Sequence, residues 1–219
     1  MTSTLPISFS ITHITASSAI LHIDGINFIT DPVFSPAGKE WDMGPTVLKN
    51  TKGPALKLRD LPVIDFVLLS HEDHPDNLDE LGRRHLDDRR VLTAQDGARK
   101  LAPRPGVTGM PRQNLPGCGV IGFVVKEVTF GEINGLPNVI CISSDTVAAS
   151  DPPLLVTMDG KQAARLFREI GADILVPMHY EFWEQFAEKE DQLRVVFEQG
   201  DVSDQVRWLE LGAEIKIFQ

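Results

Sequence analysis

The sequence predicts a mixed α/β (α+β) protein in which two β-sheets are covered by helices. A hairpin signal near the N-terminus, apolar strands that alternate with helical segments, and metal-capable side chains directly after three of those strands predict this class. The 219 residues contain no repeat and no obvious linker, and 42% of them are hydrophobic. We therefore expect one domain over residues 1–219.

The N-terminal part is predicted to begin with a hairpin followed by a long loop and a buried strand. Segments 20–23 and 26–29 flank Asp24-Gly25, a strong two-residue hairpin signal. Residues 35–60 carry scattered proline, glycine and lysine and are expected to form the loop. Residues 63–69 form a nearly continuous apolar run, which indicates a strand buried on both faces.

The remainder is predicted to alternate strands and helices. One helix is expected after Asp76-Asn77, and another over 157–170, with Asp159 as its N-cap and Gly171 as its stop. Residues 102–119 hold four prolines and four glycines and are expected to form a loop. Further helices are expected at 96–101 and 181–198, and further strands at 90–92, 120–128, 139–143, 174–176, 206–209 and 215–218.

The charge excludes some partners. The formal net charge is −10, and such a chain repels phosphate backbones and anionic membranes. The arginine cluster at 83–90 is interrupted by Asp87 and Asp88, so it is interpreted as a solvated face. We expect a small-molecule substrate, no nucleic-acid partner and no membrane partner; the pattern predicts no oligomeric state.

Cysteine usage and the N-terminus indicate the compartment. Cys118 and Cys141 form no CxxC pair, which fits a reducing compartment better than a disulfide framework. The first residues lack the pattern of a signal peptide, and no apolar run is long enough to span a bilayer. The expected location is the cytoplasm.

Metal-capable side chains follow three predicted strands: His71, Asp145 and His179. Side chains at strand ends converge on one edge of a sheet, where α/β proteins place their sites. The segment 70–79 adds His74 and several carboxylates in one turn, and imidazole and carboxylate together suit Zn, Fe or Mn. Each residue also has a structural interpretation. Asp76 or Asn77 would be an ordinary helix cap, Asp145 a turn residue and His179 a core histidine.

The stretch Ser70-His71-Glu72-Asp73-His74-Pro75-Asp76-Asn77-Leu78-Asp79 resembles the metal loop of the metallo-β-lactamase superfamily. It is most similar to a branch with Ser-His-x-x-His-x-Asp-Asn-Leu-Asp, related to the L-ascorbate-6-phosphate lactonase-like proteins. The other matches follow in order from residue 12 to about residue 210: Thr12-His13-Ile14, Thr30-Asp31-Pro32, Ser144-Asp145-Thr146, Pro177-Met178-His179-Tyr180 and Trp183.

The paired β-rich halves and the resemblance together predict two mostly antiparallel sheets packed face to face. The resemblance implies an αββα sandwich with one or two divalent metal ions between the sheets, Zn being favoured over Mn or Fe. It implies that His71 and His74 bind the first ion, that Asp76 and His179 bind the second, and that Asp145 bridges them. Asp31 would not bind an ion itself but would hold one of the ligand side chains in place. The bound hydroxide would be the nucleophile, with Asp76 orienting it as the catalytic carboxylate.

Two positions depart from the family pattern. Asn114 occupies the slot of a ligand histidine, and an amide oxygen is a poorer zinc ligand than imidazole. Asn77 fills the usual second-site histidine slot, as it commonly does in this branch. Both are weak or substituted ligands in this interpretation. The chain is also shortened against the family before Arg112 and between Asp151 and Pro153, where pocket walls usually lie.

Three functions follow from these observations. The first is a metal-dependent hydrolase that opens a small cyclic amide or ester, of lactamase or lactonase type. The second is a phosphodiester or phospholipid hydrolase, because the superfamily contains both. The third is a degenerate member that binds a molecule without turnover, which the Asn114 substitution motivates.

Overall fold

The computed structural model describes residues 8–44, 47–110, 158–169 and 171–218, and the short strands at 124–125, 139–142, 146–147 and 154–155. Within these residues the larger sheet has seven strands. In spatial order they are β14 (Glu214–Phe218), β1 (Phe9–Thr15), β2 (Ser18–Ile23), β3 (Ile26–Thr30), β6 (Phe66–Leu69), β7 (Arg90–Ala94) and β8 (Val107–Met110).

A smaller sheet and two short ribbons make up the other described strands. The smaller sheet runs in the order β13 (Ile174–Pro177), β10 (Val139–Ile142) and β9 (Val124–Val125). The ribbons pair β4 (Glu40–Asp42) with β5 (Val47–Lys49) and β11 (Thr146–Val147) with β12 (Leu154–Leu155). The helices are α1 (Glu80–His85), α2 (Gln95–Leu101), α3 (Gly160–Glu169) and α4 (Glu190–Gln199), with short 3₁₀ turns η1 (Leu58–Asp60) and η2 (Ser203–Gln205).

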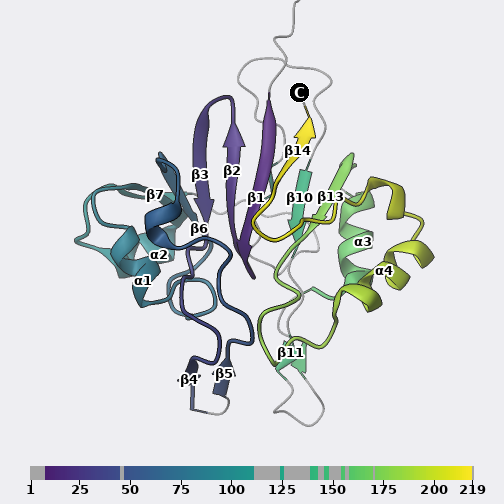
Figure 1. Ribbon diagram of the computed structural model, residues 1–219, viewed down its shortest axis with the longest axis horizontal. Helices are drawn as coiled ribbons and strands as arrows, with labels where there is room; N and C mark the ends of the chain where they lie inside the picture. The colour runs from purple at the N-terminus through teal and green to yellow at the C-terminus, as the bar shows by residue number, and fades with distance from the viewer. Residues whose placement is uncertain are drawn as a thin grey trace, which may run out of the picture.

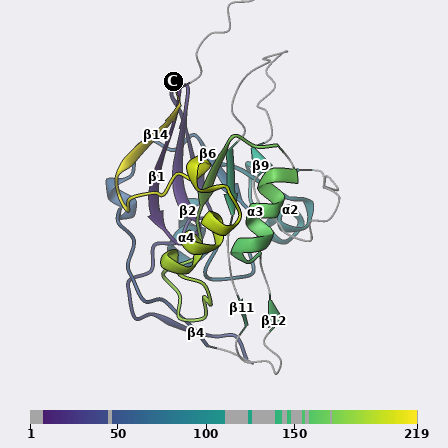
Figure 2. The ribbon, with the colours of Figure 1, turned by 90° about the vertical axis from the view of Figure 1, so that its right-hand side faces the viewer.

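The layers form an αββα sandwich. Figure 1 shows α1 and α2 outside the larger sheet and α3 and α4 outside the smaller one, with both sheets between them. Figure 2 shows α3 and α4 in front of the sheets. Between the sheets, buried side chains of β1 and β2 such as Ile11 and Leu21 pack against Ile174, Val176 and Met178. Burial of such apolar surface from both sides holds the sheets together.

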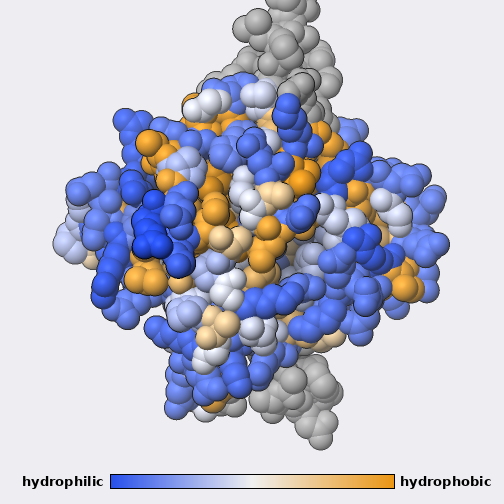
Figure 3. All heavy atoms as spheres, in the orientation of Figure 1, coloured by the Kyte–Doolittle hydropathy of each residue, from blue (hydrophilic) through white to orange (hydrophobic). Residues whose placement is uncertain are grey.

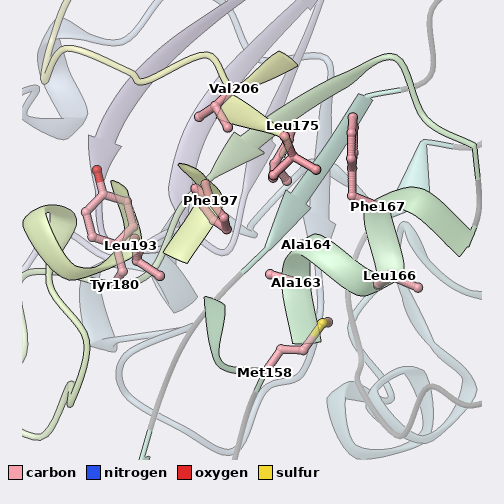
Figure 4. Close-up of a cluster of buried hydrophobic side chains, with 11 residues drawn as sticks. Met158, Ala163, Ala164, Leu166, Phe167, Leu175, Tyr180, Leu193, Phe197 and Val206 are labelled. Carbon is pink, nitrogen blue, oxygen red and sulfur yellow. The ribbon is translucent and has the colours of Figure 1, made fainter. Parts of the chain in front are cut away.

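Each helical layer has its own apolar core. On one side, Leu78 and Leu86 pack against Ile20, Ile29 and Val67 of the larger sheet. On the other side, α3 and α4 enclose a cluster around β13 that is drawn in Figure 4. On the face drawn in Figure 3, hydrophilic residues cover both helical sides and hydrophobic residues gather along the middle. None of the described helices is long and apolar enough to cross a bilayer.

Local sequence signals account for several elements. Asp24 and Gly25 have φ of 48° and 81°, as a two-residue hairpin turn requires, and they join β2 to β3 as predicted. The predicted cap of α3 is also confirmed. The Asp159 side chain accepts from the N–H of Gln162 at 2.8 Å, and the Gln162 side chain accepts from the N–H of Asp159 at 3.1 Å.

The sheets are mixed, whereas the hairpin-rich pattern had favoured mostly antiparallel sheets. Strands β14, β1, β2 and β3 pair antiparallel, but β3, β6, β7 and β8 pair parallel. The parallel half arises because α1 and α2 provide the crossovers that parallel neighbours need. It also brings the carboxyl ends of β3 and β6 to the same edge of the sheet, where Asp31 and Ser70 follow them.

Several features of the predicted secondary structure differ from the structure. The helix predicted over 181–198 begins only at Glu190, because Phe182 has a φ of 84° and packs with Trp183 into a satellite cluster. The predicted loops contain β4, β5 and β8. Residues 206–209 form no described strand beyond a bridge from Val206 to Leu175. Finally, α1 is capped by Asp79, not by Asp76 or Asn77.

Candidate metal centre

The loop after β6 places two of the predicted ligands side by side. The rings of His71 and His74 lie edge to face, with centroids 5.2 Å apart. His71 is half-buried and His74 is exposed. The backbone carbonyl of His74 accepts from the N–H of Leu78 at 2.9 Å, which closes the turn that brings the two rings together.

Asp76 and His179 meet across the two sheets. Asp76 belongs to the loop after β6, and the hydroxyl of Ser17 donates to its backbone carbonyl at 3.1 Å. His179 follows β13, has a φ of 61°, and donates its backbone N–H to the carbonyl of Ala16 at 3.1 Å. The Nε2 atom of His179 lies 3.6 Å from Oδ2 of Asp76, and both residues are buried.

The electrostatics keep these imidazoles neutral. Burial, reinforced by His71 and His13, lowers the pKa of His179 to about 3. Burial and the neighbouring His74 also lower the pKa of His71. A histidine must be neutral to bind a metal through its lone pair, so both side chains are in the required state at neutral pH.

The pair of Asp76 and His179 fits a divalent metal ion. Nε2 of His179 is a buried nitrogen without a hydrogen-bond partner in the described part of the chain, which is costly unless a ligand completes it. Two ligands of a tetrahedral ion at typical bond lengths are roughly 3.3 Å apart. The observed 3.6 Å is close to that separation and too long for a direct hydrogen bond.

A hydrogen-bond network behind His71 fixes its orientation. Asp31 accepts from the N–H of Ser70 at 2.7 Å and from its hydroxyl at 2.9 Å, and from the amide of Asn77 at 3.1 Å. The Ser70 oxygen lies 2.8 Å from Nδ1 of His71. Burial raises the pKa of Asp31 to about 7, and the hydrogen bonds from Ser70 and Asn77 oppose that rise. With Asp31 ionised, the hydroxyl donates to it and accepts from Nδ1–H, which leaves Nε2 of His71 as the ligand atom.

Ser70→Ala is therefore expected to weaken metal binding by about 10–100-fold, because it removes the acceptor that fixes the His71 tautomer. The measurement is competitive titration of the purified protein with a fluorescent zinc chelator. Ser203→Ala is the control, because Ser203 is exposed and lies far along the chain, in η2. Equal affinity of Ser70→Ala and the unmodified protein would show that this network does not position the ligand.

The predicted site residues are thus brought together in part. His71 and His74 form one close pair, and Asp76 and His179 form another, while His71 is near enough to His179 to lower its pKa. Asp145 and Asn114 lie outside the described residues. Among the described residues, no group of three or more histidine, cysteine or acidic side chains is arranged to hold an ion. The assignment of ligands stays a prediction. Asn77 uses its amide nitrogen to bond Asp31 and Ser70 at 3.1 and 3.2 Å.

Sequence reasoning missed the side chains that hold the outer side of the loop. Glu72 is buried, and Nζ of Lys100 lies 2.9 Å from its carboxylate and 3.1 Å from that of Asp73. The guanidinium of Arg83 also bonds the backbone carbonyl of Glu72. An acidic loop needs cations nearby, but only the packing of α1 and α2 determines which ones supply them.

Solved structures of other proteins share this architecture. An isothiocyanate hydrolase from Delia radicum gut bacteria is 13% identical, with a TM-score of 0.70 over 96% of this chain and 100% of that one. A metallo hydrolase from Ignicoccus hospitalis is 15% identical, with a TM-score of 0.62 over 96% and 98%. A metallo-β-lactamase fold protein from Bacillus subtilis is 14% identical, with a TM-score of 0.51 over 96% and 99%. This chain has the metallo-β-lactamase fold.

Comparison with other protein sequences finds one short match. Over 64 residues the chain is 38% identical to N-acyl-phosphatidylethanolamine-hydrolyzing phospholipase D 1 of Caenorhabditis elegans. That stretch covers 29% of this chain and 17% of the nematode protein. No protein-family model matches the chain.

Proposed function

We propose that this chain is a metal-dependent hydrolase that opens a cyclic amide or ester of a small molecule. The observation that carries the proposal is His179, a buried neutral imidazole whose Nε2 has no hydrogen-bond partner among the described residues and lies 3.6 Å from the carboxylate of Asp76. A fold maintains such a nitrogen when a ligand completes it, because an unsatisfied buried polar atom costs about 1–3 kcal/mol.

Each residue of the candidate site would have its own role. His71 and His74 would hold one ion, Asp76 and His179 a second, and Asp145 would join them. A divalent ion in this position lowers the pKa of water to near 7 and so supplies a nucleophile at neutral pH. Asp76 would accept the proton of that water at Oδ2 and return it to the leaving group. Zn is the favoured ion because imidazole and carboxylate suit it, with Mn or Fe as alternatives.

The ring-opening reaction is favoured over others by the resemblance of the metal loop to the lactonase-like branch. One of the structural neighbours is an isothiocyanate hydrolase. The acidic charge of the chain favours a small substrate over nucleic acid or an anionic membrane. A reducing location such as the cytoplasm fits the separated cysteines.

The second candidate is hydrolysis of a phosphodiester or a phospholipid. Its specific support is the 64-residue match to the nematode phospholipase D. A phosphodiester carries a negative charge, which the net charge of −10 opposes unless the metal ions neutralise it locally. This candidate therefore depends more strongly than the first on full metal occupancy.

Metal content and a substrate panel test the proposal together. Elemental analysis of the purified protein is expected to find one or two equivalents of a divalent metal, and a chelator is expected to abolish turnover. The panel contains γ- and δ-lactones, a benzoxazolinone-type lactam, benzyl isothiocyanate and bis-p-nitrophenyl phosphate. Turnover of the phosphodiester alone would favour the second candidate. A metal-free protein that does not bind added zinc would overturn both and leave the non-catalytic binding protein.

The Asn114 substitution gives a separate prediction. If Asn114 occupies a ligand slot, Asn114→His is expected to tighten zinc binding by at least about tenfold, because imidazole is the better ligand. Gln113→His is the matched control, since it adds an imidazole one position away. Unchanged affinity in Asn114→His, or an equal gain in both variants, would show that the slot assignment from the sequence is wrong.

A further inference from the structure

A cavity of about 170 Å³ lies beside the metal centre. It is bounded by the end of β1 and the turn after it, the segment after β13, the start of α4 and the segment before β14. His179 lines it, whereas His71, His74 and Asp76 do not. A protein cavity of about 150 Å³ accommodates benzene. The space therefore suits a ligand about as large as one six-membered ring.

Backbone conformation singles out the same place. Among the described non-glycine residues with positive φ, four are aspartates, which tolerate this conformation. The other three are Ala16, His179 and Phe182, with φ of 31°, 61° and 84°, and all three line the cavity. Such conformations cost about 1–3 kcal/mol each and cluster at functional sites.

One buried polar group of the cavity wall, His13, offers a hydrogen-bond acceptor. His13 is 7% exposed, and its Nε2 lies 3.0 Å from the carbonyl oxygen of Ala16. A carbonyl can only accept, so Nε2 carries the proton and Nδ1 carries the lone pair. In the described part of the chain nothing hydrogen-bonds Nδ1, and it is not among the fully enclosed atoms. His13 therefore offers an unpartnered acceptor at the cavity wall.

The charged groups of the cavity are also mainly acceptors. Glu181 and Glu190 both line it, and Lys52 is the one cationic side chain among the described residues that line it. Glu190 also accepts from Nε and Nη2 of Arg194 at 2.8 and 2.5 Å, and Arg194 is not among those lining residues. Nζ of Lys52 lies 2.7 Å from a Glu181 carboxylate oxygen and 5.5 Å from the centroid of Phe182. Lys52 shows how an ammonium group is accommodated at this rim, between a carboxylate and an aromatic face.

The remaining wall is apolar. Phe182, Leu209 and Leu211 line it. Tyr180, a member of the apolar cluster drawn in Figure 4, also lines it. A ligand that complements these groups donates hydrogen bonds, carries positive charge and presents an apolar body. We propose that this cavity binds a small organic ammonium ion with a body of about one six-membered ring. This site goes beyond the proposed hydrolytic function and does not depend on it.

The position of the cavity connects it to the metal centre. The carbonyl of Ala16 accepts both from Nε2 of His13 at 3.0 Å and from the backbone N–H of His179 at 3.1 Å. A ligand bound to Nδ1 of His13 would thus contact a histidine that shares its carbonyl acceptor with His179, a candidate metal ligand.

Calorimetric titration of the full chain with cyclohexylammonium tests the proposal, in zinc-supplemented buffer and in chelator. Cyclohexanol and cyclohexanecarboxylate are the comparators, because they keep the ring and remove or reverse the charge. The ammonium ion is expected to bind at least tenfold more tightly than either, with or without metal. Equal affinity for cyclohexanol, or no binding of the ammonium ion, would overturn the proposal whatever the hydrolase assays show.

Variants locate the binding in this cavity. Glu181→Gln combined with Glu190→Gln is expected to weaken cyclohexylammonium binding at least tenfold. Lys52→Gln is expected to strengthen it severalfold, because it removes the competing cation from Glu181. Lys52 is suited to this test because its side chain is 56% exposed.

Two further variants serve as controls. Glu184→Gln removes an exposed carboxylate outside the cavity and is expected to leave the affinity unchanged. Leu211→Trp fills the cavity from its exposed edge and is expected to abolish binding while the far-ultraviolet circular dichroism stays unchanged. If the double glutamine variant and Leu211→Trp both bind like the unmodified protein, the ligand is bound elsewhere and the assignment is wrong.

Discussion

Asp76→Asn is expected to lower kcat/KM by about 10²–10⁴-fold, the contribution typical of a general acid–base group. Asparagine keeps the size of the side chain but cannot accept a proton from water at the carboxylate. The exchange should leave the fold intact, since Ser17 bonds the backbone carbonyl of Asp76 and Asp79 caps α1. The loss would therefore report on chemistry and on the ion held with His179.

The assay uses the panel substrate that the unmodified protein hydrolyses, with metal content measured on the same samples. Asp73→Asn is the matched control, because Asp73 belongs to the same loop but is exposed and pairs with Lys100. We expect Asp73→Asn to retain activity within a few fold. Should Asp76→Asn retain activity within tenfold at full metal occupancy, Asp76 would have no catalytic role and the mechanism would need another proton acceptor.

The parts of the site that sequence predicts are those set by local order along the chain. His71 follows β6 directly and His179 follows β13 directly, so each position depends only on where an apolar run ends. The opposition of Asp76 and His179 follows once the strands belong to two packed sheets. The family resemblance provided that arrangement, because periodicity alone had left His179 open as an ordinary core histidine.

Other features depend on tertiary contacts that no local pattern encodes. Ser70 directly precedes His71 in the motif, but its role follows from its hydrogen bond to Asp31, which comes directly after the parallel neighbouring strand β3. The sequence places no metal-capable side chain at close spacing to His13, so no local pattern predicts a role for it. The cavity it lines is formed by segments as distant as Glu181 and Leu211.

The N-cap of α1 is likewise determined by tertiary contacts. Several acidic residues precede α1, and sequence favoured Asp76 or Asn77. Asp79 caps α1, and both of its carboxylate oxygens accept hydrogen bonds. Oδ1 accepts from the N–H of Gly82 at 2.7 Å, and Oδ2 accepts from the N–H of Phe34 at 2.8 Å. The cap therefore also holds the segment after β3, which no helix signal includes.

Asp79→Ala is expected to lower the free energy of unfolding by about 3–5 kcal/mol, because it leaves buried donors without acceptors. The hydroxyl of Ser35 is a third such donor, at 2.5 Å from Oδ2, and Asp79 itself is 2% exposed. Against a typical total of 5–15 kcal/mol, this loss is large. Urea unfolding followed by tryptophan fluorescence measures it. Glu80→Ala, at the exposed neighbouring position, should cost less than about 1 kcal/mol. A similarly small loss in Asp79→Ala would mean that water replaces the carboxylate, so that the segment after β3 does not depend on the cap.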